Sequence, residues 1–179
     1  KQGSIFWFKV PLEKPTDSQQ VDSVEPLSKE DETSSKHIEA LRGLKVLIID
    51  DNATSPQILR HEVQNLDMKA TVADSAPAGI ALLRKAVVKN TPYQLALVDA
   101  EIPKLEDGLN LLQEIKAEPR FFELQVIMMT TLQHPLEPYI LKQLAGYLNK
   151  PIFRDDLINS LLIAIKKKKQ EEVYNEHFD

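Results

Sequence analysis

The sequence contains no cysteine, and this absence excludes several kinds of chemistry. Without thiols the chain can form neither a disulfide framework nor a thiolate metal site, and it cannot use a cysteine nucleophile. It also lacks any apolar run that approaches the roughly 18 residues a membrane-spanning helix needs. No signal peptide is present, and the first residue is Lys1 rather than methionine. We therefore expect a cytoplasmic segment of a longer protein, without membrane contact of its own.

The chain also has fewer basic than acidic residues. The 22 Lys and Arg residues are outnumbered by 27 Asp and Glu, which gives a formal net charge of −5. No basic face offsets this charge, so the sequence argues against nucleic acid as a direct partner. The 179 residues and 42% hydrophobic content suit one globular domain with a sizeable core and a remainder.

Composition divides the chain into four zones. Residues 1–12 hold a short aromatic run, GSIFWFKVPL, that is typical of a strand. Residues 13–40 are polar, acidic and interrupted by prolines, as in a linker. Residues 41–168 carry the apolar segments and must form the core. Residues 169–179 are a charged tail that we expect either to fray or to extend the last helix.

Within residues 41–168, strand and helix patterns alternate. Continuous apolar runs predict five strands, each followed by a segment with helical apolar spacing. Such a series predicts an α/β fold with a parallel sheet, right-handed crossovers and helices on both faces. We expect Pro138 to shorten or distort the fourth helix. The predicted strands are residues 45–50, 68–74, 93–99, 124–130 and 145–149, and the predicted helices are residues 55–66, 75–88, 108–117, 135–144 and 154–167.

Polar side chains stand where these strands end. The first strand ends in Asp50 and Asp51, the third in Asp99 and the fourth in Thr130, while Lys150 follows the fifth. In a parallel sheet these ends lie along one edge, so the side chains should converge. Each has an ordinary structural alternative, such as helix capping or turn formation. Their joint occurrence at successive strand ends favours a site.

The chemistry of this set points to phosphoryl transfer. Clustered carboxylates repel one another, which either raises a pKa or requires a cation, and hard oxygen ligands suit Mg²⁺. Asp99 could act as a nucleophile toward a phosphoryl group. Lys150 and the metal would neutralise phosphoryl charge, and the Thr130 hydroxyl would donate a hydrogen bond.

Four motifs make the resemblance to a known family specific. IIDDN (48–52), LVDAEIP (97–103), MMTT (128–131) and YLNKPI (147–152) resemble those of a response-regulator receiver domain, over about residues 41–166. The resemblance implies a flavodoxin-like fold of five strand–helix units, doubly wound, with strand order 2-1-3-4-5. It also implies a two-component phosphorelay as the biological setting.

The resemblance assigns roles to the acidic residues. Asp99 would be the phosphoacceptor, taking its phosphoryl group from a phosphohistidine of a histidine kinase or a phosphotransfer domain. Asp50 and Asp51 would be the acidic pair that holds Mg²⁺ together with Asp99. Glu101 matches the position whose backbone carbonyl completes the metal shell.

The resemblance also assigns the switch. Thr130 matches the switch hydroxyl, Lys150 the lysine that pairs with the phosphate, and Tyr147 the aromatic residue that swings on activation. Phosphorylation would then alter the face formed by the fourth helix, the fifth strand and the fifth helix.

Residues 3–12 look like the closing strand of a histidine kinase ATP-binding domain. Followed by a linker and a receiver, this strand implies a hybrid sensor histidine kinase as the parent protein, whether or not that parent is membrane-anchored. The kinase itself is missing from this sequence, which has no glycine-rich ATP-lid pattern and no phosphorylatable-histidine motif. We expect the four histidines to be surface residues: His37, His61, His134 and His177. The sequence leaves open whether the protein forms a dimer.

Three departures from the family pattern leave other readings open. The loop IPKLEDG (102–108) is one residue longer than usual, Glu101 adds a carboxylate beside the site, and residues 134–146 carry two prolines. One alternative is a pseudo-receiver, an interaction module that no longer accepts phosphate. Another is a haloacid-dehalogenase-like phosphatase with Asp99 as nucleophile and Glu101 as acid. That family expects Asp-x-Asp and a capping insertion, and this sequence has neither.

Overall fold

The computed structural model of the chain describes residues 38–176, with side chains described as far as residue 168. The interpretations of residues 1–12 as a kinase strand and of residues 13–37 as linker lie outside the described residues, as do His37 and His177. Within residues 38–176, no helix combines the length and the apolar character that crossing a bilayer requires.

One parallel five-stranded sheet organises the described residues, with the order β2-β1-β3-β4-β5 that was predicted. The central strands β1, β3 and β4 are buried almost throughout, which explains their continuous apolar sequences. The edge strands β2 and β5 are partly exposed. The bounds are β1 Lys45–Ile49, β2 Lys69–Ala73, β3 Leu95–Asp99, β4 Gln125–Thr130 and β5 Gly146–Asn149.

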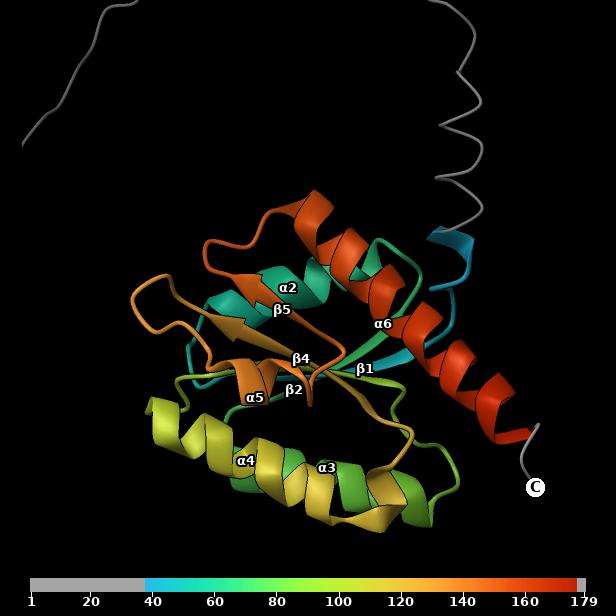
Figure 1. Cartoon of the computed structure of the whole chain (residues 1–179). Helices are drawn as coiled ribbons and strands as arrows, with labels where there is room; N and C mark the ends of the chain where they lie inside the picture. The colour runs from blue at the N-terminus through green and yellow to red at the C-terminus, as the bar shows by residue number, and fades with distance from the viewer. Residues whose placement is uncertain (1–37, 177–179) are drawn as a thin grey trace, which may run out of the picture.

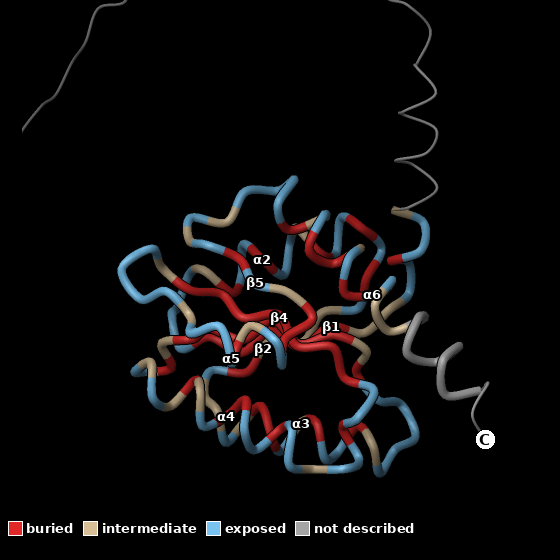
Figure 2. The backbone as a smooth tube through the Cα atoms, viewed as in Figure 1, coloured by how far each residue is buried: buried red, intermediate tan, exposed pale blue. Residues whose placement is uncertain are grey.

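Helices cover both faces of this sheet (Figure 1). Helices α2 (Ser55–Gln64) and α6 (Arg154–Glu176) lie on one face, and α3 (Ala76–Val88) and α4 (Leu105–Ala117) lie on the other. Two hydrophobic clusters fill the spaces between sheet and helices, because alternate residues of each strand point to opposite faces. Figure 2 shows the buried backbone concentrated in the sheet and on the inner sides of the helices.

The segment between β4 and β5 departs most from the prediction. Instead of a helix over residues 135–144, the structure has a four-residue helix, α5 (Pro138–Leu141). Pro138 stands at its beginning, where the missing N–H costs nothing, and the residue before a proline is disfavoured in a helix. Ile140 and Leu144 are buried and fix the segment to the core. The expected effect of Pro138 is confirmed.

Two other helix boundaries differ by more than two residues from the prediction. Helix α4 begins at Leu105 rather than at residue 108, and Glu106 and Asp107 occupy its first turn, where acidic residues are favoured. Helix α6 continues to Glu176, so the tail extends the last helix, which was one of the two expected outcomes. A short 3-10 helix, η1 (Pro119–Phe121), lies between α4 and β4 and was not predicted.

Candidate functional site

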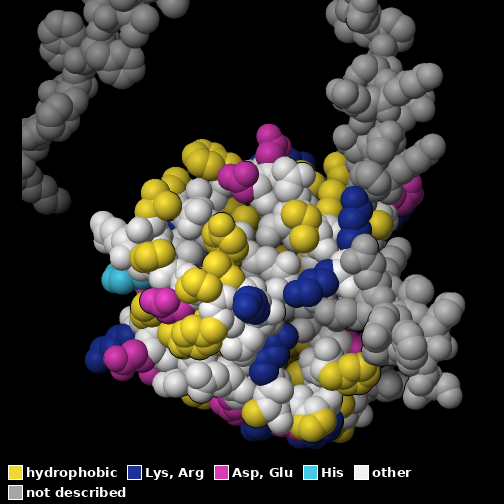
Figure 3. All heavy atoms as spheres, viewed as in Figure 1, with side chains coloured by type: hydrophobic (Ala, Val, Ile, Leu, Met, Phe, Trp, Pro, Cys, Tyr) yellow, Lys and Arg dark blue, Asp and Glu magenta, His cyan; other side chains and the backbone are white. Residues whose placement is uncertain are grey.

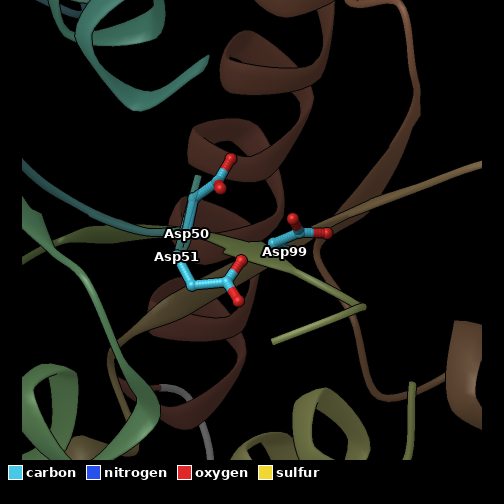
Figure 4. A group of neighbouring side chains, drawn as sticks. All are labelled: Asp50, Asp51 and Asp99. Carbon is cyan, nitrogen blue, oxygen red and sulfur yellow. The ribbon is translucent and has the colours of Figure 1, made fainter. Parts of the chain in front are cut away.

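Three carboxylates meet at the carboxyl edge of the sheet. Asp50 and Asp51 directly follow β1, and Asp99 is the last residue of the adjacent strand β3. One oxygen of each side chain lies within 4.8 Å of the others. Figure 4 shows the three side chains side by side at the ends of these strands. Asp50 and Asp99 are buried, whereas Asp51 is exposed, so the cluster is open to solvent on one side only.

Asp50 has a buried oxygen without a hydrogen-bond partner. Its Oδ1 accepts a hydrogen bond from the backbone N–H of Asn52 at 2.8 Å, while its Oδ2 has no hydrogen-bond partner. Burial is the main cause that raises the pKa of the Asp50 carboxyl, and the nearby carboxylates of Asp99 and Asp51 act in the same direction. A buried polar atom without a partner is costly, so this oxygen is suited to a ligand that the protein itself does not provide.

Asp99 is held at both of its oxygens. The ammonium of Lys150 lies 2.6 Å from Asp99 Oδ2, and the backbone N–H of Glu101 donates to Asp99 Oδ1 at 3.1 Å. Lys150 is itself positioned by its backbone N–H, which donates to the carbonyl of Thr130 at 2.7 Å. The Lys150 Nζ is also 3.9 Å from Asp50 Oδ2, so one cation stands between two buried carboxylates.

Thr130 lies at the same edge of the sheet, but its hydroxyl bonds to the following loop. The side chain is buried, and Oγ1 donates to the backbone carbonyl of His134 at 2.7 Å rather than to Asp99. The neighbouring Thr131 hydroxyl donates to Glu101 Oε1 at 3.0 Å, and His134 Nδ1 lies 2.9 Å from the same oxygen. The hydrogen bond with His134 is the largest cause that lowers the pKa of the Glu101 carboxyl.

The structure thus brings together most of the residues singled out in the sequence. Asp50, Asp51, Asp99 and Lys150 form one cluster, and the Glu101 backbone adjoins it. Tyr147 stands apart on β5, with 51% of its surface exposed. His134 is exposed, as expected, and its ring also contacts Glu101. This contact joins residues 33 positions apart in the sequence, and no local sequence pattern predicts it.

The donor set fits a small divalent cation such as Mg²⁺. Three carboxylates supply hard oxygen ligands, and Mg²⁺ is commonly bound by one or two of them while it keeps several waters. The partnerless Oδ2 of Asp50 and the exposed position of Asp51 leave room for such an ion. The cluster as it stands carries three acids against one lysine, an imbalance that a divalent cation would remove.

The backbone after Asp99 is held closely against helix α4. The N–H of Ala100 donates to the carbonyl of Met129 at 2.8 Å, which continues the pairing of β3 with β4. Gly108 of α4 packs on Ala100, and a Cβ at Gly108 would overlap the Ala100 carbonyl oxygen. The segment after Pro103 is therefore largely helical instead of forming an open loop, which limits how far it can reshape the site.

Comparison with known proteins agrees with this geometry. The family described as "Response regulator receiver domain" matches residues 46–162. The two-component response regulator ARR10 of Arabidopsis thaliana is 28% identical over 131 residues, which cover 71% of this chain and 22% of that protein. The chemotaxis protein CheY1 of Helicobacter pylori strain J99 is 27% identical over 88 residues, which cover 49% of this chain and 68% of CheY1. The chain thus spans well under half the length of the plant regulators that it resembles.

Solved structures show the same fold. A receiver domain protein from Clostridium thermocellum is 28% identical with a TM-score of 0.60, covering 71% of this chain and 98% of its own. A CheY-like receiver domain protein from Methanospirillum hungatei, 21% identical with a TM-score of 0.60, covers 70% of this chain and 97% of its own, and it supports the fold alone.

Proposed function

Because the chain belongs to the response regulator receiver domain family, we propose that it is a phosphoaccepting switch with Asp99 as the acceptor. The observation that carries this proposal is the pairing of the Lys150 ammonium with Asp99 Oδ2 at 2.6 Å, inside a cluster of three carboxylates. The phosphoryl donor would be a phosphohistidine of a histidine kinase or phosphotransfer domain. The family match gives no support to the haloacid-dehalogenase-like alternative, and the Glu101 carboxylate is engaged by Thr131 and His134.

The transfer would proceed by attack of an Asp99 carboxylate oxygen on phosphorus. A P–O bond forms as the P–N bond of phosphohistidine breaks, and the electron pair of that bond goes to the imidazole nitrogen, which takes up a proton. Lys150 supplies a positive charge at the attacked position, and the Thr130 hydroxyl would serve as a donor once it leaves the His134 carbonyl. Phosphoryl transfer depends mainly on such positioning and charge stabilisation.

We also propose that Asp50, Asp51, Asp99 and the backbone carbonyl of Glu101 hold Mg²⁺. The buried Oδ2 of Asp50 supports this assignment, because it is the only buried side-chain nitrogen or oxygen without a hydrogen-bond partner among the described residues. When bound, Mg²⁺ would offset the charge of the phosphoryl oxygens. The protein's own residues position that charge: Asp50 through its Asn52 hydrogen bond, and Asp99 through Glu101 N–H.

An apolar rim beside the acids would receive the donor domain. A cavity of about 250 Å³ lies between the start of α2 and the segment after Lys150. Asp50 and Lys150 contribute to its polar side, and Ile58 and Ile152 to its apolar side. The side chains of Ile58 and Phe153 are exposed near it. An apolar surface next to a reactive carboxylate suits a helical partner that presents a phosphohistidine.

The output surface would be formed by α5, β5 and α6. Hydrophobic side chains gather on this face over α5 and β5 (Figure 3). Tyr139 and Tyr147 are among the exposed large hydrophobic residues there, as is Leu132 in the preceding loop. Movement of Thr130 toward a phosphoryl group would change the conformation of this surface through the β4–α5 segment, and Tyr147 would turn inward.

For the parent protein we propose a hybrid sensor histidine kinase. The support is the aromatic run of residues 3–12, which resembles the closing strand of a kinase ATP-binding domain, and its order before a linker and a receiver. This proposal has a direct check. The coding sequence upstream of residue 1 should encode a glycine-rich ATP lid and a phosphorylatable histidine, and a different upstream domain would refute it.

The central proposal is tested by labelling with acetyl phosphate and Mg²⁺, followed by mass spectrometry of the intact protein. We expect the wild type to gain one phosphoryl group and Asp99→Asn to gain none. Asp74→Asn is the matched control, since Asp74 is an exposed carboxylate that follows β2 at the same sheet edge. If wild type takes up no label under conditions that label other receivers, the pseudo-receiver reading replaces ours.

A further inference from the structure

The loop that joins β4 to α5 is held by two sets of hydrogen bonds. On one side, the Thr130 hydroxyl donates to the His134 carbonyl at 2.7 Å, and the His134 N–H donates to the Thr131 carbonyl at 3.1 Å. These bonds close a compact turn over residues 131–134. The buried Thr130 hydroxyl is thereby satisfied within the loop.

On the other side, the loop is tied to the strand that carries the acceptor. Glu101 Oε1 accepts a hydrogen bond from the Thr131 hydroxyl at 3.0 Å and lies 2.9 Å from His134 Nδ1. Thr131 and His134 are the two ends of the turn, so one carboxylate holds both. We call Glu101, Thr131 and His134 the Glu101 cluster. The backbone N–H of Glu101 donates to Asp99 Oδ1, which fixes the position of the cluster relative to the acceptor.

The Thr130 hydroxyl has a single proton, so it can donate to only one acceptor at a time. While it donates to the His134 carbonyl, it cannot donate to a phosphoryl oxygen on Asp99. Any state in which Thr130 serves the phosphoryl group must therefore break the Thr130–His134 bond. The Glu101 cluster keeps His134 where it receives that bond.

We propose that Glu101 is a positioning residue that, through Thr131 and His134, holds the β4–α5 loop in the state where Thr130 is turned away from Asp99. The inference rests on the proposed function of Asp99. It adds Glu101 as a residue that opposes the change to the phosphorylated conformation. A contact made in only one of two states shifts the equilibrium toward that state. The Glu101 cluster is such a contact, and it raises the free energy needed to reach the phosphorylated conformation.

A second explanation of Glu101 predicts the opposite effect. If its carboxylate acted only by repelling the phosphoryl group, removal of the His134 donor would leave that negative charge less compensated, and phosphoryl binding would weaken. If the cluster holds the loop, removal of the donor frees the loop, and phosphoryl binding strengthens. The sign of the change therefore separates the two explanations.

The experiment measures the affinity of the protein for beryllofluoride, a phosphoryl mimic, at saturating Mg²⁺ by calorimetric titration. We expect His134→Ala to tighten binding roughly three- to tenfold, the range of one hydrogen bond to a charged, partly exposed group. His134→Asn is the matched variant, because its side-chain nitrogen stands at the position of the histidine Nδ1 and can still donate to Glu101. It should bind within about twofold of wild type.

A double-mutant cycle tests that the effect runs through Glu101. In the Glu101→Ala background, His134→Ala should change the beryllofluoride affinity no further. An undiminished effect in that background, or weaker or unchanged binding by the single variant His134→Ala, would overturn the proposal.

A readout without a phosphoryl mimic keeps this inference separate from the proposed function. In metal-free protein, methyl NMR of Thr130 should show one side-chain rotamer in wild type and His134→Asn, and a second, populated rotamer in His134→Ala. If wild type binds no beryllofluoride, the proposed function fails while the NMR result still decides the role of the cluster. An unchanged Thr130 rotamer in His134→Ala would refute that role.

Discussion

Lys150 Nζ lies 2.6 Å from Asp99 Oδ2, although Asp99 ends β3 and Lys150 follows β5, and these strands are not neighbours. Strand β4 lies between β3, which ends in Asp99, and β5, which Lys150 follows. The lysine therefore reaches across the end of β4, past Thr130, to the acceptor strand. This ion pair connects the centre of the sheet to its β5 edge.

Replacing Lys150 by methionine should slow phosphorylation. The substitution keeps the length of the side chain but removes a charge-assisted hydrogen bond to a buried carboxylate, so we expect labelling by acetyl phosphate to fall roughly tenfold or more. The measurement is the initial rate of phosphoryl incorporation. Lys104→Met, at an exposed lysine just before α4, serves as the control and should retain the wild-type rate. Equal rates for the two variants would remove Lys150 from the phosphoryl site.

Asp50→Asn should stabilise the metal-free protein at neutral pH. The folded-state pKa of Asp50 is raised by burial, so the proton is bound more tightly in the folded than in the unfolded chain. Its stabilising contribution is fully present below the unfolded pKa and is lost as pH rises through the folded pKa. Asparagine cannot ionise, so it avoids the cost of a buried charge at every pH at which the Asp50 carboxyl has lost its proton, a difference of about 1 kcal/mol or more.

Urea unfolding at pH 7 and at acidic pH measures this difference. The gain from Asp50→Asn should shrink as pH falls toward the unfolded pKa of the aspartate. Asp74→Asn, at an exposed carboxylate, should change stability little at either pH. A variant less stable than wild type at pH 7 without Mg²⁺ would contradict this prediction and show that Asn52 and Lys150 offset the burial of the Asp50 carboxylate.

Mg²⁺ should stabilise the wild type through the carboxylate cluster. A ligand that binds only the folded state adds about 1.4 kcal/mol at a concentration ten times its Kd. Asp51→Asn should reduce this effect strongly without loss of basal stability, because Asp51 is exposed. Thermal melts with and without Mg²⁺ provide the measurement, with Asp74→Asn again as the control. Equal Mg²⁺ shifts in Asp51→Asn and wild type would place the ion elsewhere.

Gly108→Ala should destabilise the protein although it removes a glycine from a helix. In an unobstructed helix this change gains up to about 1 kcal/mol. Here the new Cβ would overlap the Ala100 carbonyl oxygen, so the start of α4 must move, at a cost of about 1–3 kcal/mol. Asn110→Ala, at an exposed position of the same helix, should be neutral or stabilising. Denaturant unfolding distinguishes the two, and a gain in stability for Gly108→Ala would contradict the packing described above.

The sequence predicted the sheet well because buried parallel strands leave a continuous apolar pattern. The runs that became β1, β3 and β4 are apolar on both faces, and the polar residues that follow them mark the functional edge. The start of α4 was missed although Glu106 and Asp107 stood where a first helical turn favours acids. Apolar spacing predicted a fourth helix from residue 135, and Pro138 shortens it, as expected, to the four residues of α5.

The clustering of Asp50, Asp51, Asp99 and Lys150 could be predicted because strand order alone brings strand ends together. The direction of the Thr130 hydroxyl could not, since it depends on which loop carbonyl comes within reach. The contact of His134 with Glu101 could not be predicted from the sequence either. Both arise from how two loops meet in space, and neither loop shows a periodic pattern that could be read in advance.

The brevity of α5 has a kinetic consequence. Its backbone contributes few hydrogen bonds: Ile140 and Leu141 donate to the Glu137 carbonyl, and Lys142 donates to that of Pro138. Rearranging this segment therefore requires little helix to melt, and the prolines prevent it from re-forming as a longer helix toward β4. We expect exchange between its conformations within microseconds to milliseconds, the range of loop and lid motions. The equilibrium between these conformations would then be re-established quickly after any change at Asp99, so that the proposed output face keeps no lasting shape of its own.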